Sequence, residues 1–330
     1  MNGSRPTIYD VARLAGVSKS LVSLVLRGAP GVSATSRDAV AEAIRELGYR
    51  PSRAASDLAA RRTMIVGVLI DDYANPWFVD LLRGLGDALS EDGYRLSVAD
   101  SATTPLTEDP VETLLSMRAD GIVVARDVPQ VLLGANVPPF VIAGTRADIP
   151  EGVDAVGNDD EKGARIATEH LLSLGHRVIG HLAVAGGAGG ARHRSFRAVM
   201  ADSTADGIAT TYRGPATERA GYQGTLRLLA DHPQVTAIFA ANDVMAIGAL
   251  GAARELGLDV PSQLSIVGYD NTALAQTRLI DLTTVDDDSF GVGRESGRLL
   301  RARMAGQEPV DVRRTLEPSL VVRGTSGPPR

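Results

Sequence analysis

Polar side chains stand directly after two short apolar runs in the second half of the chain. Asn242 and Asp243 follow residues 237–240, and Asp270 follows residues 264–269. An asparagine amide can donate and accept hydrogen bonds at once, and an aspartate accepts them from hydroxyl groups. These residue types predict a site for a small hydroxylated molecule. Each of them could instead cap the helix that follows, and we expect this second role for Asp243.

A second group of candidate binding residues follows the apolar run at residues 64–70. Asp72 and Asn75 offer polar groups there, and Trp77 is the only tryptophan of the chain. The face of an indole ring can stack on a sugar ring or a base. Trp77 could equally begin a helix and pack in the core, and the sequence leaves both roles open.

Signals for catalysis or for metal binding are weak. The glycine-rich residues 186–190 lack the Gly-Lys-Ser/Thr that a nucleotide phosphate loop needs, so we expect a flexible loop at the rim of a site. The aspartates at 286–288 could hold a cation, but a solvated connector is expected. The five histidines lack metal-ligand spacing, and no nucleophile–base pair is evident. We therefore expect no catalytic residue, no metal and no cofactor, and hence no enzyme.

These polar residues must be positioned by the alternating pattern that begins at residue 64. Strands are expected at residues 64–70, 95–99, 121–124, 139–142, 178–184, 237–240 and 264–269. Helices are expected at residues 77–89, 111–118, 161–174, 192–200, 219–229, 243–256 and 290–304. Two such series predict two lobes, each a doubly wound parallel sheet. Ligands of such sheets bind beyond the carboxyl ends of the strands, and two facing lobes make a cleft that can close.

The first fifty residues have a different, all-helical pattern. Thr7 and Asp10 form a Thr-x-x-Asp helix start, and Gly16 can end that helix with a positive φ. Ser18 can cap the next helix, and a third is expected between positions 33 and 48. Two short helices joined by a tight turn suit the major groove of DNA. A small helical domain without a nucleic-acid role would show the same pattern.

Charge favours the DNA-binding alternative. Residues 1–62 carry ten basic and five acidic side chains, a net charge of +5, whereas the whole chain of 330 residues carries −6. A basic head on an acidic body is expected of a DNA reader with a regulatory domain. No run approaches the roughly 20 apolar residues of a membrane helix, and no apolar signal segment precedes Thr7. We therefore expect no membrane association and a cytoplasmic location.

The head resembles a known family. The stretch TIYDVARLAGVS, followed by VS and by GYRP, is similar to the lactose-repressor (LacI/GalR) family of bacterial transcription regulators. The resemblance extends from Thr7 to about Arg323. It implies a homodimer, a double-stranded DNA operator and a small effector, most often a sugar or a nucleobase. It also implies a periplasmic-binding-protein-like body in which the chain crosses between lobes near Asn158, Asp288 and Pro318.

The resemblance implies which residues meet DNA. Lys19, Ser20 and Ser23 face the major groove in the family arrangement. Leu24 stands where many members carry an arginine, and it can touch a thymine methyl group rather than a guanine. The alanine-rich hinge would press Leu58 into the minor groove, although a passive linker remains the alternative. The candidate DNA contacts are Thr7, Ser18, Lys19, Ser20, Ser23, Leu24, Arg27, Arg53, Ala55 and Leu58.

Further effector contacts also follow from the resemblance. Arg192 matches the arginine before the family's Gly-Phe pair, although Ser195 replaces that glycine here. An arginine fork can hold two adjacent hydroxyls or a carboxylate. Phe78 matches a residue at the mouth of the cleft, and Arg146 follows a threonine where many members have an aspartate. The candidate effector contacts are Asp72, Asn75, Trp77, Phe78, Arg146, Arg192, Asn242 and Asp270.

The predicted fold class is α/β, with an N-terminal helix-turn-helix head and a two-lobe, doubly wound effector domain. We expect the head at residues 1–50, the hinge at 51–62 and the effector domain at 63–330. The first lobe would comprise 63–158 and 289–318, and the second 159–288 and 319–330. The expected function is a ligand-responsive transcriptional regulator, most simply a repressor. A sugar-binding transport protein, a sugar-acting enzyme and a transcriptional activator are the alternatives.

Overall fold

The computed structural model describes residues 6–26, 29–49, 62–102, 109–203, 208–307 and 311–330. The chain divides into two compact units, Met1–Thr63 and Met64–Arg330. The expected hinge and the candidate contacts Arg27, Arg53, Ala55 and Leu58 lie outside the described residues, apart from the last residue of the hinge.

The first unit contains helices α1 (Ile8–Leu14), α2 (Lys19–Leu26) and α3 (Ala34–Leu47). The predicted start of α1 is present, because the Asp10 carboxylate accepts from the backbone N–H of Thr7 at 2.9 Å and from its hydroxyl at 2.7 Å. Gly16 has a φ of 66° in the turn that follows, and the Ser18 hydroxyl accepts from the Leu21 N–H at 3.2 Å. A small core holds the three helices together and is formed by Val11, Ala12, Val22, Val40 and Ala43.

The second unit contains two six-stranded sheets. The sheet of the first lobe has the order β11-β5-β4-β3-β1-β2. Its strands are β1 (Ile65–Ile70), β2 (Arg95–Asp100), β3 (Gly121–Ala125), β4 (Phe140–Ala143), β5 (Ala155–Asn158) and β11 (Arg313–Leu316). The sheet of the second lobe has the order β12-β10-β9-β8-β6-β7. Its strands are β6 (Val178–Ala183), β7 (Ile208–Arg213), β8 (Ala237–Ala240), β9 (Ser265–Tyr269), β10 (Thr283–Asp286) and β12 (Ser319–Val321). Only the β10–β12 pair is antiparallel among the described strands.

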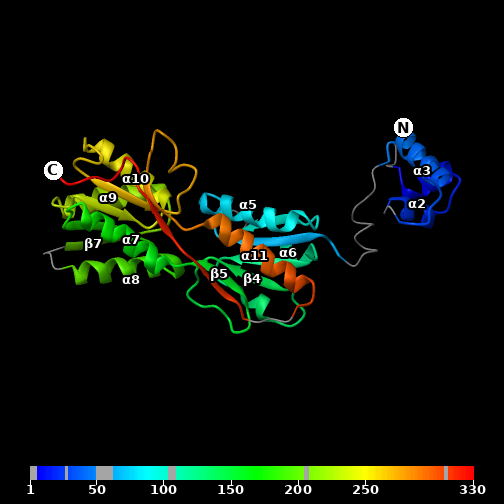
Figure 1. Ribbon diagram of the computed structural model, residues 1–330, viewed down its shortest axis with the longest axis horizontal. Coiled ribbons are helices and arrows are strands. Elements are labelled where there is room, and N and C mark those ends of the chain that lie inside the picture. Colours follow the sequence, from blue (N-terminus) through cyan, green and yellow to red (C-terminus); the bar gives the residue numbers. More distant parts are fainter. Residues whose placement is uncertain (1–5, 27–28, 50–61, 103–108, 204–207, 308–310) are drawn as a thin grey trace. The chain divides into compact units, whose positions relative to one another are not determined.

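Helices cover both faces of each sheet. In the first lobe α5 (Trp77–Ser90) and α11 (Ser289–Met304) pack against one face of the sheet and form one hydrophobic core with it. Helix α6 (Pro110–Ser116) packs against the other face and forms a second core. In the second lobe α9 (Glu218–Asp231) and α10 (Asp243–Glu255) lie on one face, and α7 (Asp160–Ser173) and α8 (Gly187–Asp202) on the other. Figure 1 shows α5 beside α11 and α7 beside α8. The predicted α/β class with two doubly wound lobes is therefore confirmed.

Two glycines let α5 and α11 approach closely. A Cβ atom on Gly84 would lie 2.0 Å from the carbonyl oxygen of Phe290, and one on Gly293 would lie 2.1 Å from that of Leu81. Any larger residue would push the two backbones apart, although these segments are about two hundred residues distant in the sequence. This contact anchors α11, which returns from the second lobe, to the first lobe.

The chain passes between the lobes three times. It leaves the first sheet after β5, returns from β10 into α11, and crosses again between β11 and β12. The sequence did not predict β5, β7, β10, β11 or β12, which have three to six residues each. Most of them carry too few consecutive apolar residues to be recognised as strands. These crossings bring strand ends of both lobes toward one region of the second unit.

Candidate functional site

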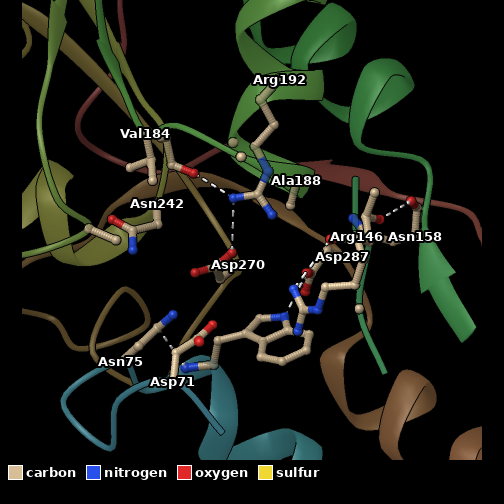
Figure 2. Close-up of a pocket in the computed structure, with 18 of the residues that line it drawn as sticks. Asp71, Asn75, Arg146, Asn158, Val184, Ala188, Arg192, Asn242, Asp270 and Asp287 are labelled. Carbon is tan, nitrogen blue, oxygen red and sulfur yellow. Dashed lines mark hydrogen bonds and ion pairs between the residues drawn. The ribbon is translucent and has the colours of Figure 1, made fainter. Parts of the chain in front are cut away.

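A pocket of about 250 Å³ lies among the carboxyl ends of strands from both lobes. Such ends are where ligands of doubly wound sheets bind, and the volume is near the lower end for small-molecule sites. Figure 2 shows its polar side chains directed toward a common hollow. The lining residues are Asp71, Asn75, Trp77, Phe78, Asp127, Gly144, Thr145, Arg146, Asn158, Val184, Ala185, Gly186, Gly187, Ala188, Gly189, Arg192, Ala216, Ala241, Asn242, Asp270 and Asp287. Seven of the eight predicted effector contacts are in this set; Asp72 is the exception.

Arg192 is held in the wall of the pocket by other protein groups. Its Nε donates to Asp160 at 2.6 Å, and its Nη1 donates to Asp270 at 3.4 Å and to the carbonyl oxygen of Ala241. The guanidinium carbon lies 3.5 Å from the ring centroid of Tyr269. Burial opposes its charged form, but the neighbouring carboxylates keep the pKa of Arg192 above its ordinary value. Most of the fork expected to hold a ligand is thus engaged by the protein, and the described residues leave Nη2 for a ligand (Figure 2).

Asp270 follows β9 and faces the same hollow. It is buried, and burial raises its pKa well above the ordinary value for an aspartate. Its backbone φ is 105°, in a region that residues other than glycine rarely adopt. Backbone strain of this kind is found at binding sites, where the surrounding structure holds a side chain in a required direction.

Asn242 lines the pocket as expected, and it also holds the cap position that was expected for Asp243. Asn242 is the N-cap of α10, and its Oδ1 accepts from the Met245 N–H at 2.9 Å while the residue lines the pocket. Asp243 is fully buried away from the pocket lining. It accepts from the backbone and the hydroxyl of Thr272 at 2.7 and 2.9 Å and from the Thr284 hydroxyl at 2.5 Å. Asp243 therefore ties the loop after β9 to α10, and the expectation that it caps the helix was wrong.

Trp77 begins a helix and packs in the core, and it also lines the pocket. The stacking of its indole ring on a ligand stays a prediction. Trp77 is the first residue of α5, is 8% exposed, and packs edge-on against Phe78 with ring centroids 5.2 Å apart. Its indole Nε1 donates to Asp287 at 2.8 Å. This hydrogen bond joins α5 of the first lobe to the segment that follows β10 of the second.

Of the two polar residues after β1 that were predicted to contact the effector, Asn75 lines the pocket and Asp72 does not. Asp72 does not line the pocket, because its carboxylate accepts from the Ala74 N–H at 2.7 Å in the turn, and Asp71 lines the pocket instead. Asn75 lines it as expected, with its Oδ1 accepting from the Trp77 N–H at 3.1 Å. Arg146 also lines it and donates to the carbonyl oxygens of Thr145 at 3.2 Å and Ala143 at 2.9 Å. Burial lowers the pKa of Arg146.

The glycine-rich segment is not the flexible rim loop that the sequence predicted. Gly187 to Gly190 form the first turn of α8, which extends to Asp202. A Cβ on Gly187 would lie 2.5 Å from the Thr145 carbonyl oxygen, and one on Gly189 would lie 2.7 Å from that of Val184. Glycine is a poor helix former, but here close packing requires it, so tertiary contacts override propensity. The helix start consequently reaches the pocket wall.

Sequence reasoning missed several polar residues of the lining, among them Asp71, Asp127 and Asp287. The aspartates at 286–288 were expected to form a solvated connector, but Asp287 is fully buried and lines the pocket. Asp286 instead accepts from the Asn271 side chain at 2.8 Å, and Asp288 caps α11 by accepting from the Gly291 N–H at 2.9 Å. The rule that found Asn242 and Asp270, a polar residue just after a strand, would have found Asp287 if β10 had been recognised.

The first unit presents a separate polar surface. Thr7, Ser18, Lys19 and Ser20 are exposed, Leu24 is 38% exposed, and Ser23 is half-buried. Tyr9 is 62% exposed, and its hydroxyl lies 3.4 Å from the Lys19 ammonium. The same ammonium lies 5.0 Å from the centroid of the Tyr9 ring. This tyrosine shares the surface of the candidate contacts, although it was not among them.

Two further properties concern the described residues. No group of three or more His, Cys, Asp or Glu side chains among them is arranged to hold a metal ion. No helix in the described part of the chain is long and apolar enough to cross a membrane.

Comparison with known proteins agrees with this architecture. Residues 7–52 match the model for bacterial regulatory proteins of the lacI family, and residues 168–326 match a periplasmic binding protein-like domain. The transcriptional regulator CelR of Thermobifida fusca is 36% identical, with 97% of this chain and 98% of that protein covered.

Solved structures are also similar. A LacI-family regulatory protein from Corynebacterium glutamicum is 54% identical over 81% of this chain and all of that chain, with a TM-score of 0.74. A CelR–cellobiose complex is 34% identical over 97% of this chain and all of that chain, with a TM-score of 0.72. The Lac repressor dimer bound to operator and the anti-inducer ONPF is 29% identical over 98% of this chain and all of that chain, with a TM-score of 0.84.

The chain therefore belongs to the lacI family of bacterial regulatory proteins. It is a ligand-responsive DNA-binding transcriptional regulator, as the sequence predicted. Its similar relatives are regulators rather than enzymes. A sugar-binding transport protein would have no role for the helix-turn-helix head at residues 7–52.

Proposed function

We propose that the protein is a homodimeric repressor that acts in the cytoplasm and whose operator affinity changes when a small sugar-like effector occupies the pocket. The observation that carries this proposal is the convergence of polar and aromatic side chains from both lobes on one pocket. Asn242, Asp270 and Arg192 come from the second lobe, and Asn75 and Trp77 from the first. A ligand held by both groups would favour one lobe separation over another, and such differential binding is what shifts a conformational equilibrium.

The relatives support the nature of both partners. The CelR structure is a complex with cellobiose, and the Lac repressor structure is a dimer bound to operator DNA. Lys19, Ser20, Ser23 and Leu24 on α2 are the residues we propose for base readout. A helix of this kind lies in the major groove with its N-terminal residues at the base edges.

We further propose the functional division of the chain. Residues 1–50 form the DNA-binding head, and 51–62 form the hinge. Residues 63–158 with 289–318 form the first lobe, and 159–288 with 319–330 the second. A hinge that folds only at one separation of two first lobes would let the effector alter DNA binding without touching DNA, as reciprocal linkage allows. Leu58 is the residue we propose as the minor-groove wedge of that hinge.

A thermal-shift screen of the full chain against sugars and nucleobases tests the effector assignment. A ligand that binds only the folded state raises the midpoint of unfolding. We expect a sugar to raise it, and we expect Asn242→Ala to abolish that response. A nucleobase that raises the midpoint while every sugar leaves it unchanged would contradict the sugar assignment.

A further inference from the structure

The hydroxyl of Tyr269 lies where the chain first leaves the first lobe. Tyr269 is the last residue of β9 and is 0% exposed. Its hydroxyl oxygen accepts a hydrogen bond from Nδ2 of Asn158 at 3.0 Å, and Asn158 is the last residue of β5. The two strands belong to the sheets of different lobes. One buried hydrogen bond therefore joins the lobes at the first crossing.

The segment around this hydrogen bond is closely packed. A Cβ atom on Gly163, in the first turn of α7, would lie 2.2 Å from the Tyr269 hydroxyl oxygen, so only glycine lets α7 begin there. Directly after Asn158, the Asp159 N–H donates to the carbonyl oxygen of Leu316 at 3.0 Å. Leu316 ends β11, from which the chain makes its third crossing. The Tyr269 hydroxyl therefore contacts the place where the first and third crossings lie side by side.

The ring of Tyr269 connects this place to the pocket. The guanidinium carbon of Arg192 lies 3.5 Å from the centroid of that ring, and Arg192 Nε donates to Asp160 at 2.6 Å. Asp160 begins α7, close after Asn158 in the chain. Arg192 and Asn158 line the pocket (Figure 2), whereas the buried Tyr269 lies behind the lining. A ligand that displaces the Arg192 guanidinium therefore acts on both groups that reach the first crossing.

The hydrogen bond between Tyr269 and Asn158 depends on how the two lobes are placed. One partner belongs to each lobe, and a rotation about the crossings changes their separation and alignment. Hydrogen bonds weaken steeply outside a narrow range of distance and angle, and a buried group that loses its partner is costly. The bond therefore favours one arrangement of the lobes, and a ligand that moves the Tyr269 ring shifts the balance between arrangements.

We infer that the Tyr269 hydroxyl is a positioning group that transmits effector binding at Arg192 to the first crossing between the lobes, through its hydrogen bond to Asn158. The inference rests on the proposed function, because it names the regulation of the proposed effector site. Tyr269 acts through Arg192 and Asn158 and does not itself contact the effector. Phenylalanine at this position would keep the ring beside Arg192 and would lose only the hydrogen bond to the first lobe.

The inference is tested by the coupling factor, the factor by which a sugar changes the affinity of the full chain for a DNA fragment selected from random sequence. Glucose, ribose and cellobiose are each added in excess, and at least one is expected to change the DNA affinity of the wild type. Tyr269→Phe should reduce that coupling factor about threefold or more, as the loss of one buried hydrogen bond predicts. A residue that only shapes the pocket would weaken sugar binding equally with and without DNA, which leaves the coupling factor unchanged.

Tyr222→Phe is the matched control. The Tyr222 hydroxyl donates to Glu255 in an exposed contact between α9 and α10, so the variant removes the same group from the same lobe, away from the crossings. Its coupling factor should equal that of the wild type. A Tyr222→Phe variant that loses as much coupling as Tyr269→Phe would show a general effect of losing a hydroxyl and would overturn the inference.

Asn158→Ala, alone and combined with Tyr269→Phe, tests whether the two residues act as a pair. The same hydrogen bond is missing in both single variants and in the double variant, so all three should have the same reduced coupling factor. Because the sugar is in excess, a change in sugar affinity at Asn158 does not alter the coupling factor. Losses that multiply in the double variant would mean that the residues act independently and would contradict the transmission through their bond.

The outcomes separate the inference from the proposed function. A wild type that responds to a sugar, together with a Tyr269→Phe variant that keeps the full coupling factor, would overturn the inference alone. A wild-type DNA affinity that none of the three sugars changes would contradict the proposed sugar response itself, and the inference would fall with it. Reduced coupling in Tyr269→Phe and Asn158→Ala, with Tyr222→Phe unchanged, would establish the inference.

Discussion

At the scale of single residues, two buried aspartates of the second unit differ in how their oxygens are satisfied. Both oxygens of Asp243 accept from threonines, whereas one oxygen of Asp287 has no hydrogen-bond partner among the residues that the structure describes. The sequence could place Asn242 and Asp270 because an apolar run precedes each of them. It could not place Asp287, because the strand before it contains Thr283, Thr284 and Asp286 and resembles a polar connector.

Asp287 makes a pH prediction. Burial raises its pKa to about 7, against an ordinary value of 3.8. Between these values the folded protein binds more protons at this site than the unfolded chain does, so the stability contributed by Asp287 is lost as pH rises through about 7. Asp287→Asn removes that titration. In urea unfolding, the free energy of unfolding of the variant should therefore rise relative to that of the wild type by about 1 kcal/mol or more between pH 5 and pH 8. A difference that stays constant over this range would contradict the raised pKa.

At the scale of elements, local chemistry was predictable and close packing was not. The caps at Thr7 and Ser18 and the turn at Gly16 follow from residue types that satisfy free backbone groups or permit a positive φ. The start of α8 was mistaken for a loop, because glycines disfavour a helix in isolation. Gly187 and Gly189 are required by backbone atoms of other segments, and the sequence gives no signal of that approach.

The α5–α11 contact makes a stability prediction with an internal control. Gly84→Ala places a Cβ 2.0 Å from the Phe290 carbonyl oxygen and should reduce the free energy of unfolding by about 1–3 kcal/mol. Gly86→Ala lies in the same helix with nothing within 4 Å of the added carbon. It should raise the free energy of unfolding by up to about 1 kcal/mol, because alanine is the better helix former. Equal effects of the two substitutions in urea unfolding would argue against a close helix contact.

At the scale of the whole molecule, the head and the body differ in both charge and architecture. Residues 1–62 carry a net charge of +5 within a chain of −6, so the remainder is strongly acidic and phosphate should attract only the head. The predicted order of head and two-lobe body could be read from the sequence, because composition and apolar periodicity change near residue 64. The number of crossings came from family resemblance, because strands of three or four residues give little periodic signal.

Assembly gives a prediction at this scale. A helix-turn-helix head reaches only one half-site, so two copies are needed to read a near-palindrome whose half-sites lie about one helical turn apart. Light scattering should give the mass of a dimer at micromolar concentration. A monomeric mass, together with binding to an isolated half-site as tight as to the paired site, would contradict this arrangement.

The central claim is that occupation of the pocket in the second unit controls DNA binding by the first. The direct measurement is the affinity of the full chain for a DNA fragment selected from random sequence, with and without a sugar that saturates the pocket. We expect the sugar to change that affinity by about 5- to 150-fold, and we expect Asn242→Ala to keep DNA binding while losing the change. An unchanged DNA affinity at saturating sugar would show that the two units are not coupled.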